Sequence, residues 1–249
     1  MRGRPRQGSL ALVTQLAGRS VLVTGASGGL GAPITRLLAE RGARLTLVGR
    51  DAERLAAVAA PGAATTRVAL DLRRAGAAER AVQAALHDHA AVDGVVVAAG
   101  AVAFGPATEL PDDVLVELFT LNTLAPIRLL RAAVPALRAS AEAGHEPFFC
   151  VLSAVVAEQP VAGMAGYGAS KAALTSFDSA AARELRRVGI RVLDARPPHT
   201  ETGLADRPLH GSAPRLPQGL SPEDVAARVV AAIEAGERDL PSTAFGPGG

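Results

Sequence analysis

The chain is poor in the side chains on which several functional classes depend. Its 249 residues include one cysteine, one tyrosine and no tryptophan, and only 3% of the residues are aromatic. The single cysteine, Cys150, excludes a disulfide within the chain and is typical of a reducing compartment. No apolar run approaches the length of a membrane-spanning helix, and the basic N-terminal residues are not followed by the apolar stretch of a signal peptide. We therefore expect a cytoplasmic protein without a membrane partner.

Positive and negative charges nearly cancel. The chain has 26 Lys+Arg and 24 Asp+Glu residues, and no basic stripe is interleaved with aromatic side chains. Nucleic-acid binding is therefore not expected. The spacing His199-x-Glu201 lacks a third residue placed to complete a metal site, so no bound metal is expected either.

Short apolar runs alternate with longer segments of helical periodicity. The apolar residues are mostly Ala, Val and Leu, which suits parallel strands covered by Ala-rich helices. We expect strands over residues 20–24, 44–48, 65–70, 92–98, 148–153 and 190–195. We expect helices to about residue 41, from residue 51, and over residues 77–89, 112–138 (bent near Pro126 and Pro135), 166–188 and 222–235. This strict alternation predicts an α/β fold of Rossmann type, a doubly wound parallel sheet in a three-layer α/β/α arrangement.

No repeat and no linker divides the chain, so we expect a single domain over residues 17–245. Residues 1–16 are expected to form a flexible basic arm, and residues 246–249 a disordered tail. The Pro- and Gly-rich segment at about 197–220 has no periodicity. We expect it to form a flap over the substrate.

The strongest chemical signal is a pair of residues that each occur once. Lys171 is the only lysine among the 26 basic residues, and Tyr167, the only tyrosine, precedes it by four positions. Arginine is always protonated, whereas the pKa of a lysine can move. A spacing of four places both side chains on one face of a helix, where an ammonium favours the phenolate form of a tyrosine. The pair predicts a proton donor and acceptor, and hence an enzyme.

Glycines follow the first expected strand at Gly25, Gly29 and Gly31. Glycines between a strand and a helix allow the backbone to approach a pyrophosphate, which the helix N-terminus then binds. The spacing differs from the G-x-G-x-x-G fingerprint of dinucleotide sites, so a purely structural glycine turn is the alternative.

The ends of the second and third strands carry further candidates for the nucleotide. Gly49 leaves room at the end of the second strand, and Arg50 is placed to pair with a 2′-phosphate, which favours NADP over NAD. A solvated arginine is the alternative for Arg50. Asp71 and Leu72 follow the third strand, where a carboxylate could accept from the adenine amine; an ordinary strand-end aspartate is the alternative.

The glycine turn, one asparagine in the long helix and the Tyr/Lys pair share an order and a spacing with a known pattern. The matching residues are Thr24, Gly25, Gly29, Gly31, Asn122, Tyr167 and Lys171. In these the chain resembles the short-chain dehydrogenase/reductase family from about residue 17 to residue 235. The resemblance implies NADP(H)-dependent reduction of a small carbonyl substrate, or oxidation of an alcohol.

The resemblance also implies roles. Tyr167 would be the general acid or base, Lys171 would lower its pKa and hold the nicotinamide ribose, and Asn122 would hold a water in the proton relay. Thr202 would contact the nicotinamide carboxamide. The full set implied for cofactor binding is Gly25, Ser27, Gly28, Gly29, Leu30, Gly31, Arg50, Asp71, Leu72, Ala99, Gly100, Tyr167, Lys171, Pro197 and Thr202.

Three departures from the family pattern stand out. The family's catalytic serine lies thirteen residues before the tyrosine, where this chain has Ala154. The asparagines that follow the family's fourth strand are here Val97 and Ala98, and the Pro-Gly after its sixth strand is here Pro197-Pro198.

Ala154 bears most on function. Ser153 is kept as a candidate catalytic residue, although strand alternation predicts that it points away from the site unless a bulge re-aims it. A substrate hydroxyl or a water could also replace the missing donor, or the enzyme could be slow. A catalytically silent nucleotide-binding protein with a regulatory role is the alternative function.

The expected assembly is a homodimer through the Ala-rich faces of the long helix and the Tyr/Lys helix. A tetramer remains possible. Members of the family often end with a strand that helps to form a tetramer. In this chain only residues 240–245 could form that strand.

Overall fold

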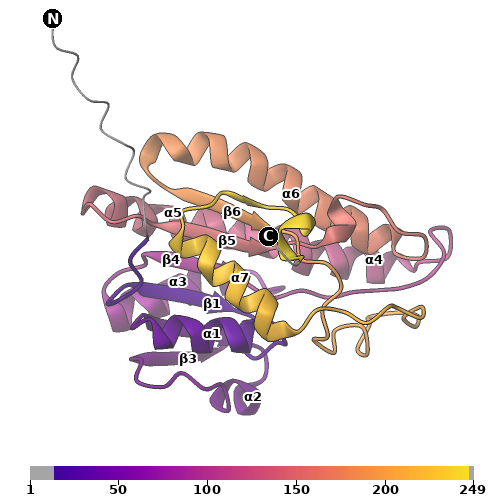
Figure 1. Cartoon of the computed structure of the whole chain (residues 1–249), viewed down its shortest axis with the longest axis horizontal. Helices are drawn as coiled ribbons and strands as arrows, with labels where there is room; N and C mark the ends of the chain where they lie inside the picture. Colours follow the sequence, from indigo (N-terminus) through magenta and orange to yellow (C-terminus); the bar gives the residue numbers. More distant parts are fainter. Residues whose placement is uncertain (1–13, 247–249) are drawn as a thin grey trace, which may run out of the picture.

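Seven parallel strands form the centre of the computed structural model, which describes residues 14–246 (Figure 1). The strands are β1 (Ser20–Thr24), β2 (Arg44–Gly49), β3 (Thr65–Ala69), β4 (Gly94–Val97), β5 (Phe148–Leu152), β6 (Arg191–Ala195) and β7 (Asp239–Leu240). Their order in the sheet is β3-β2-β1-β4-β5-β6-β7. The order therefore reverses between β1 and β4, the point at which open α/β sheets bind ligands at the carboxyl ends of their strands.

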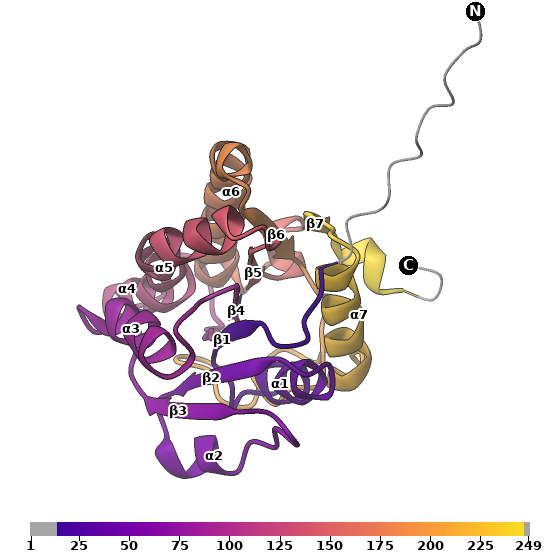
Figure 2. The ribbon, with the colours of Figure 1, turned by 90° about the vertical axis from the view of Figure 1, so that its left-hand side faces the viewer.

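Helices cover both faces of the sheet, as Figure 2 shows. The helices α1 (Gly31–Glu40) and α7 (Pro222–Glu234) pack on one face, and α3 (Ala77–His89), α5 (Ala125–Glu142) and α6 (Ala165–Leu185) pack on the other. The short helix α2 (Ala52–Ala56) follows β2, and α4 (Asp112–Phe119) precedes the long helix. The apolar core on each face of the sheet is built mainly from Val, Leu and Ala. Because parallel strands lie between two layers of helices, the predicted doubly wound, three-layer α/β/α fold is confirmed.

The long helix expected over residues 112–138 is interrupted by a π-helical turn. Residues Thr120–Leu124 have π geometry between α4 and α5. Pro126 follows the π turn closely, near the start of α5, and Pro135 lies inside α5. Single π turns within helices often occur at functional sites, and this one contains Asn122.

The two ends of the domain differ from the expected boundaries. Residues 14–16 belong to the domain: Leu16 is buried in the core, and the backbone N–H of Thr14 donates to the carbonyl of Glu234. The rest of the expected arm, residues 1–13, and residues 247–249 of the expected tail lie outside the described residues. The last strand is shorter than residues 240–245 suggested, because β7 ends at Leu240, Pro241 follows it, and Ser242–Phe245 form a 3-10 turn. Within residues 14–246, every helix is too short or too polar to cross a membrane.

Candidate active site

Tyr167 and Lys171 lie on one face of the first turns of α6. Both side chains are buried, with 7% and 4% of their surface exposed. The Nζ atom of Lys171 donates to the carbonyl oxygen of Leu152 at 2.8 Å, at the carboxyl end of β5. The lysine therefore holds the start of α6 against the end of the sheet at which ligands bind.

Burial controls the pKa of both groups. It raises the pKa of Tyr167 to about 12 and lowers the pKa of Lys171 to about 8, because a dry environment disfavours both the phenolate and the ammonium. The predicted lowering of the Tyr167 pKa by Lys171 is thus not found in the chain itself. The reason is that loss of water around the phenol is the dominant effect, while the ammonium is turned to the Leu152 carbonyl.

Asn122 joins this pair through the segment that follows β4. Its Oδ1 accepts from the N–H of Ala101 and its Nδ2 donates to the carbonyl of Ala101, both at 2.9 Å; Nδ2 also donates to Ser170 Oγ at 3.0 Å. A Cβ atom built on Gly100 would lie 3.4 Å from Asn122 Oδ1 and 3.6 Å from Lys171 Nζ. The structure therefore brings three of the candidate site residues, Asn122, Lys171 and Gly100, together.

Ser153 is not brought to the Tyr167 hydroxyl. Its Oγ lies 3.3 Å from the carbonyl oxygen of Lys171 and 3.0 Å from Thr175 Oγ1, so it faces the body of α6. This is the orientation that strand alternation predicts, and no bulge re-aims the side chain. Ala154, by contrast, packs in the same apolar cluster as Tyr167. The position that lacks a hydroxyl is therefore the one beside the tyrosine.

The glycine turn after β1 leaves no space for side chains. Gly25 has φ +70°, and a Cβ atom on it would lie 2.5 Å from the backbone N of Ala99. A Cβ atom on Gly31 would strike the Gly25 carbonyl oxygen. The first turn of α1 has no side-chain cap, since Leu30 occupies the N-cap position. A backbone without room for side chains, at a helix N-terminus without a side-chain cap, fits a pyrophosphate, although the Ala32 N–H already donates to the Gly28 carbonyl and Pro33 has no N–H.

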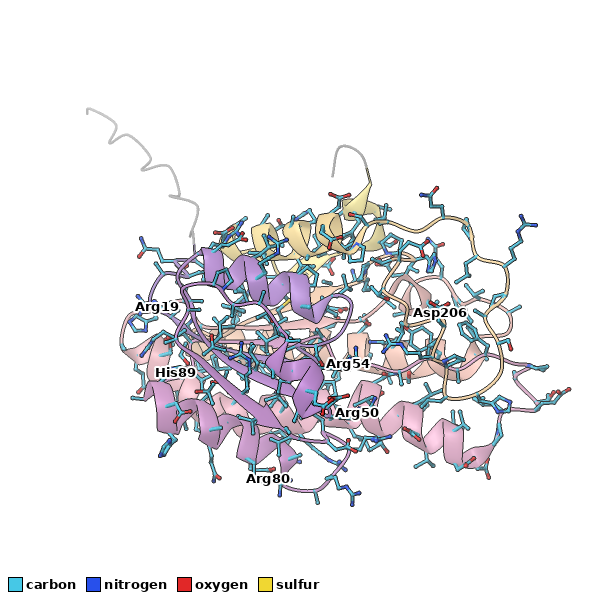
Figure 3. The ribbon with its side chains drawn as sticks, turned by 90° about the horizontal axis from the view of Figure 1, so that it is seen from below. Arg19, Arg50, Arg54, Arg80, His89 and Asp206 are labelled. Atoms are coloured by element: carbon cyan, nitrogen blue, oxygen red, sulfur yellow. The ribbon has the colours of Figure 1, made fainter. Side chains whose placement is uncertain are left out.

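The end of β2 is narrow and basic. A Cβ atom on Gly49 would lie 3.2 Å from Ser27 Oγ, so a larger side chain at this position would crowd the turn. Arg54 Nη2 donates to the Ser27 carbonyl at 3.0 Å. The Arg50 side chain is exposed, and its charge contributes to a lowered pKa of Asp71. In Figure 3, Arg50 and Arg54 lie near the carboxyl ends of the strands, whereas Arg19 and His89 lie towards the other end of the sheet.

Asp71 is already engaged within the chain. Its carboxylate accepts from Arg73 Nε at 2.9 Å and from Arg73 Nη2 at 2.8 Å, and this bonding lowers its pKa. Arg73 also pairs with Glu117 on α4. An adenine amine at this place would have to share the carboxylate with Arg73. Leu72 is buried against the core of the sheet.

The expected flap begins and ends at one point. Thr200 and Leu220 form a parallel bridge, and the N–H of Leu220 donates to the carbonyl of His199 at 2.9 Å. Thr202 lies against the glycine turn, since a Cβ atom on Gly29 would be 2.5 Å from Thr202 Cβ. The flap base therefore touches the nucleotide-binding turn.

Other flap residues have structural contacts. The Pro197 carbonyl accepts from the N–H of Val155, next to Ala154, at 3.0 Å. Glu201 Oε1 accepts from the N–H of Gly219 at 2.7 Å and lies 3.5 Å from His199 Nε2. Within residues 14–246 there is no group of three His, Cys, Asp or Glu side chains that could hold a metal.

The surroundings of Tyr167 are apolar, which the sequence alone did not indicate. Residues buried with Tyr167 and Ala154 are Val102, Ala103, Phe104, Leu118 and Val156, and the flap residues Leu204, Ala205 and Leu209 pack against them. Two backbone hydrogen bonds join the flap to the segment after β4. The Leu209 N–H donates to the Val102 carbonyl at 2.8 Å, and the Phe104 N–H donates to the His210 carbonyl at 3.0 Å. These side chains are apolar and have no sequence motif, so only the folded structure shows that they surround Tyr167.

The comparisons with known proteins agree with this geometry. Residues 19–210 match the family described as short chain dehydrogenase. A cyclic-di-GMP-binding biofilm dispersal mediator protein of Escherichia coli (strain K12) is 33% identical over 218 residues, which cover 85% of this chain and 88% of that protein. The match to a short chain dehydrogenase of Pseudocercospora fijiensis, 29% identical over 196 residues, spans 62% of that protein's length.

Solved structures give the same result. A metagenomic short-chain oxidoreductase in complex with NADP is 32% identical with a TM-score of 0.75, over 92% of this chain and 98% of that one. A short-chain dehydrogenase from Sphingobium yanoikuyae in complex with NADPH is 30% identical with a TM-score of 0.79, over 90% and 87% of the two chains. With Tyr167, Lys171 and Asn122 assembled at the carboxyl end of the sheet, this chain belongs to the short-chain dehydrogenase/reductase family.

Proposed function

We propose that this protein is an NADP(H)-dependent oxidoreductase that reduces a carbonyl group of a small apolar substrate, or oxidises the corresponding alcohol. The meeting of Lys171, Asn122 and Gly100 beside the buried Tyr167 is the observation that carries this proposal. The glycine cradle at Gly25, with its uncapped helix N-terminus, supports the binding of a dinucleotide.

A bound nicotinamide would supply or accept the hydride, and the chain would control the proton. With a pKa of about 12, Tyr167 carries its proton at neutral pH and is ready to donate it to a carbonyl oxygen. Lys171, with a pKa of about 8, is mostly protonated at pH 7. The chain alone therefore holds Tyr167 in the protonated form that reduction requires. Oxidation would need an added positive charge near the phenol to favour the phenolate.

The preference for NADP rests on the end of β2. An acidic side chain that would hold the ribose hydroxyls of NAD would be crowded at Gly49, where a Cβ atom would lie 3.2 Å from Ser27 Oγ. The exposed Arg50 guanidinium is available for a 2′-phosphate and has the right charge.

A second candidate function is nucleotide binding without turnover. Ala154 favours it, since the donor expected beside Tyr167 is absent and Ser153 faces α6. The Escherichia coli relative is named as a cyclic-di-GMP-binding mediator rather than by a reaction. Activity with NADPH separates the two functions.

Replacing Tyr167 with Phe removes the proposed acid and leaves the ring in its apolar cluster. We expect the rate of NADPH oxidation with a panel of apolar ketones and aldehydes to fall by about 10²-fold or more, and NADPH affinity to change much less than the rate. Unchanged turnover would remove Tyr167 from the mechanism. Tight NADPH binding by a wild-type protein that turns over none of the panel would favour the second candidate.

Replacing Ala154 with Ser restores a hydroxyl beside Tyr167. One preorganised donor is typically worth on the order of 10²–10³ in rate, so we expect kcat to rise by about 10-fold or more. Ala157→Ser, in the same short loop, is the matched control and should change kcat little. An unchanged kcat in the Ala154→Ser variant would show that another donor already fills this role.

Replacing Arg50 with Ala tests the cofactor preference. We expect the Kd for NADPH to rise by about 10-fold or more, because a charge-assisted contact to the 2′-phosphate is lost, and the Kd for NADH to change little. Arg80→Ala, an exposed arginine on α3, is the control. Equal losses for both cofactors, or none, would contradict the assignment.

A further inference from the structure

Two buried carboxyl groups lie behind the Tyr/Lys pair. Asp178 on α6 and Asp194 on β6 are 2% and 5% exposed. Asp178 follows Lys171 by seven positions, so both project from the same face of α6. Asp194 alternates along β6 with Leu193 and Ala195, whose side chains lie in the core on the α1 and α7 side of the sheet, so Asp194 faces α6.

The hydrogen bonding of these two groups is incomplete. Both carboxyl oxygens of Asp178 and Oδ1 of Asp194 have no partner among the described residues. Asp194 Oδ2 accepts from Arg196 Nη1 at 2.7 Å. An unpartnered ionised carboxylate is costly in a dry site. A proton on Asp178 that is donated to Asp194 Oδ1, directly or through a buried water, would satisfy two of the three free oxygens.

The electrostatics agree with one shared proton. Burial, and then the charge of Asp194, raise the pKa of Asp178 to about 8, while the Lys171 ammonium opposes this rise. Burial also raises the pKa of Asp194, and its bond to Arg196 and the neighbouring Thr175 oppose this rise without cancelling it. The proton therefore belongs to the Asp178 side of the pair at neutral pH.

The other charged groups near the pair are already matched. Arg196 binds Asp239 of β7 at 2.6 Å and Glu158 after β5, in addition to Asp194. Tyr167 is neutral at pH 7, and Cys150 is a neutral thiol on the opposite face of the sheet, since burial raises its pKa to about 12. The acidic charges that act on the Lys171 ammonium are those of Asp194 and Asp178.

We propose that Asp178 and Asp194 form a buried acid pair that shares one proton and acts as the counter-charge of Lys171. They are positioning residues, since they act through the lysine and do not touch the substrate. As pH rises, the pair loses its shared proton, and its second negative charge then opposes loss of the proton from Lys171. The consequence for catalysis rests on the proposed function of Lys171 and Tyr167.

The composition of the chain makes a direct test possible. Because Lys171 is the only lysine, labelling with lysine carrying ¹³C at Cε gives one signal from the protein, and its NMR titration reports the Lys171 pKa. In the wild type we expect titration at about pH 8. In Asp178→Asn the pKa should fall by about half a unit or more, because a neutral amide cannot supply the second charge. Glu184→Gln, an exposed acid on the same helix, should leave it unchanged.

A merely structural role for Asp178 predicts a different result. Loss of packing alone would lower the melting temperature and leave the Lys171 titration within about 0.2 units of the wild type, an outcome that would overturn the proposal. Because this titration uses no substrate, its result does not depend on whether the proposed reaction occurs. With turnover established, the alkaline limb of kcat in Asp178→Asn should move to lower pH by the same shift as the NMR signal.

Folding stability gives a second readout with a defined sign. The Asp178 pKa is about 8 in the folded chain against an ordinary value of 3.8, so its contribution to stability is present below pH 3.8 and is lost as pH rises towards 8. The Asn variant lacks this group. Its melting temperature should therefore fall less between pH 5 and pH 8 than that of the wild type, and an equal fall would contradict the shared proton.

Discussion

Burial of the Lys171 ammonium is the constraint on which the candidate site depends. A charged amine that is 4% exposed needs partners inside the protein, and the Leu152 carbonyl at 2.8 Å is the direct one. That bond connects the start of α6 to the end of β5. It also fixes Tyr167, one turn earlier, in the apolar cluster that the flap covers.

The remaining parts of the site follow from the topology of the sheet. The glycine turn follows β1, Gly100 follows β4, and these strands are neighbours where the strand order reverses. The π turn brings Asn122 to Ala101 and Ser170, so it links the segment after β4 to α6. Backbone groups and side chains from four elements thus meet at one edge, and each is held by hydrogen bonds within the chain.

Much of this arrangement could be predicted from the sequence, because periodicity and unique residues are local signals. Alternating strands and helices predicted the sheet, and the spacing from Tyr167 to Lys171 predicted a shared helix face. The rest depends on contacts that no local pattern contains. The π geometry at Asn122, the ion pair between Asp71 and Arg73, and the burial of Asp178 and Asp194 arise only when distant segments pack. The raised pKa of Tyr167 is another such case, since it results from burial of the phenol and not from the spacing to Lys171.

Under the proposed function, Tyr167 is a proton carrier whose pKa responds to a nicotinamide cofactor. As the only tyrosine of the chain, it can be followed by ¹³C NMR after labelling at Cζ. The protein alone should titrate at about pH 12. With saturating NADP⁺ the titration should move down by about one unit or more, because a positive charge beside the phenol favours the phenolate. A Tyr167 signal that titrates at the same pH with and without bound NADP⁺ would contradict the account.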